Sequence, residues 1–135
     1  MAQRIFPLDE EMSQRLSTHR DWVWDSVGAD RPLDRDDPGT ALSVITALLN
    51  DGIRPDETWK LQSLGVVLGD VMSRMMSLPW VVVDDEHGHD PALDFGGVGN
   101  LLFPLTMISK RVEAGENVNV YELLSTTAQS ITRGD

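Results

Sequence analysis

The chain has 135 residues, of which 41% are hydrophobic and 24% charged, and its 22 acidic and 11 basic side chains give a net charge of −11. We expect a single globular domain over residues 1–135, since this length and composition fit neither a disordered tail nor a fibre. The negative charge argues against nucleic acid as a partner, because attraction to phosphate requires basic patches. The lack of cysteine excludes disulfides, zinc–cysteine sites and thiol nucleophiles.

Neither a targeting segment nor a membrane anchor is expected. Residues 1–12 do not contain the apolar core of a signal peptide. No strictly apolar run exceeds five residues, which is far short of a membrane span, so no membrane partner is expected. The predicted location is therefore the cytoplasm.

The first part of the chain predicts two helices. Residues 9–27 carry apolar side chains at spacings of three and four, and Asp9 is the expected N-cap. The face that this spacing buries consists of Met12, Leu16, His19 and Val23. Residues 30–39, with two prolines and four aspartates, have the composition of a solvated loop. A second helix follows over residues 40–50, and Thr40 is its expected cap.

A third and longer helix is predicted over residues 56–77, with Asp56 as its cap. Its apolar positions alternate by three and four along one face: Leu61, Leu64, Leu68, Val71 and Met75. Gly65 and Gly69 lie one turn apart on the flank of this helix, where a glycine costs about 1 kcal/mol relative to alanine. We therefore expect another backbone segment to pack closely against these two positions.

After Pro79 the sequence pattern changes from helical to extended. Residues 80–83 are aromatic and β-branched, which predicts a strand. A polar connection over residues 84–91 leads to a second strand at 92–95, and a third follows at 101–103.

Two more helical segments complete the chain. Residues 109–114 predict a short helix, and Asn119 is the expected cap of a C-terminal helix. The predicted fold class is therefore α+β, with three N-terminal helices, a small antiparallel meander of about three strands and a C-terminal helix.

The polar connection is the stretch richest in chemically reactive side chains. It holds four carboxylates and two imidazoles: Asp84, Asp85, Glu86, His87, His89 and Asp90. One interpretation is a metal or ligand site, or an enzyme, that uses these carboxylates with His87 and His89. The spacing matches no EF-hand, and a His-x-His pair alone is a weak signal, so a solvated acidic turn is favoured. We assign no catalytic residue, metal ligand or cofactor.

Aromatic side chains supply a second candidate surface. Trp22 and Trp24 lie two positions apart on the first predicted helix, so they cannot both face inward. One of them is expected to be partly exposed and hence suited to contact with a protein. Trp80 is expected in the core, and His19, on an apolar face, is expected to be a buried, hydrogen-bonded histidine.

Several short motifs follow one another between residues 64 and 123. They are Leu68-Gly69-Asp70, Trp80, Asp85-Glu86, Gly88, Asp90-Pro91-Ala92-Leu93, Phe103 to Arg111, and Gly115-Glu116. In this order they resemble an uncharacterised bacterial family, domain of unknown function 3806. The resemblance implies no activity, and it leaves residues 1–55 outside a family-like core at 56–135. The family has other residue types at the positions of His87 and His89, which disfavours a metal site there.

The sequence therefore predicts a noncatalytic, acidic protein-binding module. An immunity or inhibitor protein that neutralises a basic bacterial toxin or effector is one form of it, since complementary charge speeds such capture. The expected contact residues are Asp84, Asp85, Glu86, Asp90, Trp22 and Trp24. The alternatives are the metal- or ligand-binding protein or enzyme based on residues 84–90, and a homodimer formed through an apolar helix or an exposed tryptophan.

Overall fold

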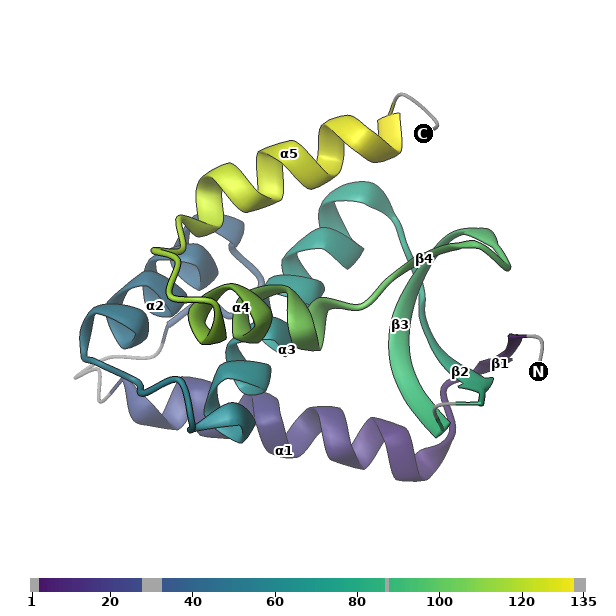
Figure 1. Cartoon of the computed structure of the whole chain (residues 1–135), viewed down its shortest axis with the longest axis horizontal. Coiled ribbons are helices and arrows are strands. Elements are labelled where there is room, and N and C mark those ends of the chain that lie inside the picture. The colour runs from purple at the N-terminus through teal and green to yellow at the C-terminus, as the bar shows by residue number, and fades with distance from the viewer. Residues whose placement is uncertain (1–2, 28–32, 87, 133–135) are drawn as a thin grey trace.

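The computed structural model describes residues 3–27, 33–86 and 88–132. Its fold is α+β, as the sequence predicts, with a four-stranded antiparallel sheet at one end and the helices on one side of it (Figure 1). In chain order the elements are β1 (Arg4–Pro7), α1 (Glu10–Ser26), α2 (Pro38–Asn50), α3 (Thr58–Met76), β2 (Trp80–Asp85), β3 (Gly88–Gly97), β4 (Asn100–Leu102), α4 (Pro104–Glu113) and α5 (Val120–Thr132).

The sheet is larger than the sequence predicts. Its strand order is β1-β2-β3-β4, and the N-terminal strand β1 was not predicted. A segment of four residues that ends in proline has no periodicity of its own, and it is extended because it pairs with β2 from Arg4 to Pro7. The predicted polar connection at 84–91 was also wrong, since β2 and β3 stay paired as far as Asp85 and Gly88. Backbone hydrogen bonds hold polar residues in a ladder that side-chain patterns do not reveal.

Helix boundaries differ from the prediction, in α2 and α3 because the capping residue was misidentified. The Asp37 side chain, rather than Thr40, caps α2, and it accepts a hydrogen bond from the Thr40 amide at 2.9 Å. Helix α3 begins after Glu57, not at Asp56. Helix α4 begins at Pro104 instead of residue 109, because proline suits the first turn of a helix.

Helix α3 is the centre of the core. The predicted positions Leu61, Leu64, Leu68 and Val71 are buried, whereas Met75 is 57% exposed and Met72 takes its place. Met76, in the same last turn, is half-buried and packs against the core, so the buried face continues through Met72 and Met76 and Met75 lies beside it. The predicted caps Asp9 and Asn119 both accept hydrogen bonds from the first turn of their helices.

Gly65 and Gly69 allow two close approaches to α3, by backbone at Gly65, as expected, and by side chains at Gly69. A Cβ atom on Gly65 would lie 2.3 Å from the Pro104 carbonyl oxygen at the start of α4. A Cβ atom on Gly69 would lie 2.5 Å from the ring of Trp80. Both distances are too short for any real contact, so the two glycines set how closely α4 and β2 pack on α3.

Asp70 joins three elements beside these glycines. Its carboxylate accepts two hydrogen bonds from Arg20 of α1, at 2.6 and 2.9 Å, and one from the Trp80 indole of β2, at 3.1 Å. The bidentate pair is partly buried, which gives it fixed geometry as well as charge. We refer to Arg20, Gly69, Asp70 and Trp80 as the Asp70 junction.

We expect Gly65→Ala and Gly69→Ala each to lower the free energy of unfolding by about 1–3 kcal/mol, the usual cost of overpacking. This loss would appear despite a gain of about 1 kcal/mol in helix propensity. Urea denaturation measures it. The matched control is Gly39→Ala in α2, whose Cβ would make an ordinary 3.5 Å contact and should leave stability unchanged or raised. Equal stability of all three variants would contradict the close packing.

Candidate functional site

The structure divides the predicted acidic residues between the two faces of the β2–β3 hairpin. Asp84 lies between Arg4 of β1 and His89 of β3 in the strand register. It accepts a hydrogen bond from the Arg4 guanidinium at 2.8 Å, and His89 Nδ1 lies 3.2 Å from its other oxygen. Asp84, on β2, thus contacts side chains of both neighbouring strands, β1 and β3. Only 17% of its side chain is exposed.

The opposite face of the hairpin is apolar. Trp80 packs against the helical core. Because adjacent residues on a strand point to opposite faces of the sheet, Val81 and Val83 point away from the helices. They belong to a separate cluster whose described members all come from strands or from the residue after β4. We call this cluster the outer sheet face: Ile5, Val81, Val83, Ala92, Leu101 and Phe103.

Acidic side chains lie at one end of the outer sheet face. Asp90 is opposite Val83 in the register, and Asp85 follows Val83 by two residues, so both carboxylates share this face. Glu86 is exposed and directly follows the end of β2. Three of the four predicted acidic contact residues therefore adjoin an apolar surface that the sequence analysis did not anticipate.

The alternative interpretation of a metal site that uses His87 and His89 gains no support from the part of the chain that the structure covers. His87 lies outside the described residues. His89 is paired with Asp84, and no three carboxylates or imidazoles among the described residues converge as a metal ion requires.

The two N-terminal tryptophans differ in exposure, as the helical spacing predicts. Trp24 is 8% exposed, with the Arg35 guanidinium 5.6 Å from the centre of its ring, so it offers little surface to a partner. Trp22 is half-buried and meets the edge of Trp59 at 6.1 Å. Trp59, which is 45% exposed, was missed because it lies outside the apolar stripe of α3.

His19 is the buried, hydrogen-bonded histidine that its position predicts. Its ring stacks under Trp59 with centroids 4.6 Å apart. The Ser63 hydroxyl donates its single hydrogen to the Trp59 carbonyl, so His19 Nδ1 must donate to Ser63 Oγ, 2.7 Å away. Burial, with a smaller contribution from the nearby Arg15 charge, lowers the pKa of His19 from 6.5 to about 4.

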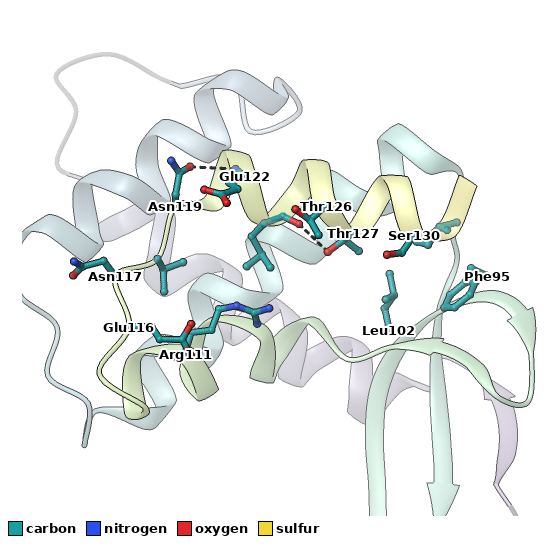
Figure 2. Close-up of a pocket in the computed structure, with 13 residues that line it drawn as sticks. Phe95, Leu102, Arg111, Glu116, Asn117, Asn119, Glu122, Thr126, Thr127 and Ser130 are labelled. Carbon is teal, nitrogen blue, oxygen red and sulfur yellow. Dashed lines mark hydrogen bonds between the residues drawn. The ribbon is translucent and has the colours of Figure 1, made fainter. Parts of the chain in front are cut away.

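A cavity of about 380 Å³ lies between α5, the end of α4 and the β3–β4 region. Figure 2 shows Arg111 of α4 reaching toward α5, with Glu116 beside it and Glu122 at the start of α5. Phe95 and Leu102 close the other end (Figure 2). We call this cavity the α4–α5 groove. The adjacent basic residues 110 and 111 are its sequence signal, but nothing in the sequence places the second of them in a cavity.

The family model described as "Domain of unknown function (DUF3806)" matches residues 41–123. This is more than half of the chain, so the chain belongs to that family, as the motifs indicated. The match begins earlier than the resemblance did, and it includes most of α2. No match was found among curated proteins.

One crystal structure, of a protein from Bacteroides thetaiotaomicron VPI-5482, is similar over 95% of this chain with a TM-score of 0.82. The sequence identity is 16%, so the likeness concerns the fold alone. This chain spans about half the length of that protein, since the match covers 48% of it. No helix in the described ranges combines the length and apolar character of a membrane span.

Stability should depend on pH through His19. Its pKa is lower in the folded protein than the unfolded value of 6.5, so the unfolded chain binds the proton first and stability falls as pH falls from about 6.5 to about 4. We expect a loss of about 2 kcal/mol between pH 7 and pH 5. Urea denaturation across this range, with NMR titration of the His19 ring, measures both quantities. A ring that titrates near 6.5, or stability that is constant down to pH 5, would contradict the assignment.

Proposed function

We propose that this chain is a noncatalytic protein-binding module that holds a basic partner protein on the outer sheet face. The observation that carries the proposal is the apolar cluster on the side of the sheet away from the helices, with carboxylates at one end. Protein interfaces commonly combine an apolar centre with a polar rim. The half-buried side chains Ile5, Leu101 and Phe103 form the accessible part of such a centre.

The arrangement of the face favours lysine or arginine on the partner. These side chains have apolar stems and charged ends, and they bind best where both can be accommodated. Val83 itself is buried, so the stem would lie along the half-buried Ile5, opposite Val83 on β1, with its charged end toward Asp90, opposite Val83 on β3. Asp85 and Glu86 extend the negative region beyond this point. A guanidinium or ammonium group would form charge-assisted hydrogen bonds there.

The overall charge supports the same class of partner. A net charge of −11 on 135 residues attracts a basic protein before contact and repels acidic ones. This attraction raises the association rate and weakens as salt screens it.

An inhibitor or immunity protein is the form of this function that we favour. Such a protein neutralises a basic toxin or effector by covering it, so it needs a complementary surface and no chemistry of its own. Among the predicted contact residues, Asp85, Glu86 and Asp90 supply this surface. Asp84 has the different role of positioning the hairpin through Arg4.

Affinity capture from the lysate of the host organism, with this chain carrying a tag, tests the proposal. We expect one basic protein in stoichiometric amount at low salt, with less retained at moderate salt. The double variant Asp85→Asn/Asp90→Asn should lower the affinity for that protein about tenfold or more.

The matched control removes the same charge elsewhere. Asp25→Asn/Asp51→Asn alters exposed residues near the C-terminal ends of α1 and α2, and it should leave capture nearly unchanged. Equal loss in the two double variants would show that only net charge matters. Undiminished binding by Asp85→Asn/Asp90→Asn would rule out this face as the binding site.

A further inference from the structure

The α4–α5 groove contains an arginine that forms no direct ion pair with a described carboxylate. Arg111 is half-buried in this cavity, and Nη1 of its guanidinium donates to the Met107 carbonyl at 2.8 Å. Within the described residues the guanidinium makes no other hydrogen bond and no ion pair. By contrast, Arg20 and Arg74 each pair with an aspartate at 2.6 Å. In a chain with twice as many acids as bases, an arginine without a carboxylate partner is available to an anionic ligand.

Carboxylates line the same groove without pairing with Arg111. Glu116, on the connection after α4, and Glu122, in the first turn of α5, both border the cavity. A ligand with only negative charge would meet these carboxylates unfavourably, and one with only positive charge would leave Arg111 without a partner. The groove therefore matches a ligand that carries both charges.

The rest of the lining sets the shape of the ligand. Phe95, Leu102 and Ile131 form an apolar wall, while Thr126 and Ser130 project hydroxyl groups from α5. Figure 2 shows Phe95 and Leu102 at the end of the groove away from Glu122. A volume of about 380 Å³ is within the range of small-molecule sites.

We infer that the α4–α5 groove binds a small zwitterion with an apolar side chain, either an α-amino acid or a dipeptide. Arg111 binds the carboxylate, Glu116 and Glu122 bind the ammonium group, and the apolar wall covers the side chain. The N-terminus of α5 is not required as an anion site, because Asn119 already accepts hydrogen bonds from the Tyr121 and Glu122 amides.

NMR titration of the full chain with L-leucine and with L-leucyl-L-leucine tests the inference and separates the two sources of the zwitterion. We expect saturable shifts confined to the lining of the groove with at least one of these probes. Two related probes test the contributions of the ammonium group and of the carboxylate separately. N-acetyl-L-leucine lacks the ammonium group and L-leucinamide lacks the carboxylate, and each should bind about tenfold more weakly or worse.

Adjacent residues provide a matched pair of variants. Arg111→Gln should abolish the saturable shifts, whereas Lys110→Gln removes the same charge from an exposed neighbour and should leave them unchanged. If Arg111→Gln fails to fold, the four probes on the unaltered chain still decide the matter. The inference would be overturned if neither zwitterion gave saturable shifts, or if the shifts lay outside the groove. It would also be overturned if N-acetyl-L-leucine or L-leucinamide bound as tightly as the zwitterions.

Discussion

The Asp70 junction is the constraint on which the rest of the structure depends. One carboxylate accepts hydrogen bonds from Arg20 and Trp80, and thereby joins α1, α3 and β2. The absence of a side chain at Gly69 lets the Trp80 ring lie directly against α3. Arg20 and Asp70 are both less than one-third exposed, so loss of either one would leave a partly buried charge without its partner.

The orientation of Trp80 determines which surface the sheet presents. With Trp80 on the inner side, strand alternation turns Val81 and Val83 to the outer side. The register then brings Asp85 and Asp90 to the same outer side. It brings Asp84 to the inner side, where Arg4 and His89 pair with it. The proposed binding surface is thus a consequence of packing at a single strand position, more than of the acidic composition of the hairpin.

Local patterns in the sequence predicted those features that depend on neighbouring residues. The spacing of leucines along α3, the caps Asp9 and Asn119, and the close approach at Gly65 and Gly69 all follow from local rules. Features that depend on pairing between distant segments were missed. Strand β1 exists because it pairs with β2 more than 70 residues away, and Arg111 enters a cavity that forms only when α5 covers it.

Site-specific photocrosslinking in living host cells tests the central claim, that the outer sheet face is the binding surface, most directly. A photoreactive residue would replace Leu101, on the outer sheet face, or the exposed Tyr121 of α5 as the control. The account predicts a covalent adduct with one basic protein from position 101 and none from position 121. Adducts of the same protein from position 121 alone, or no adduct from position 101, would contradict it.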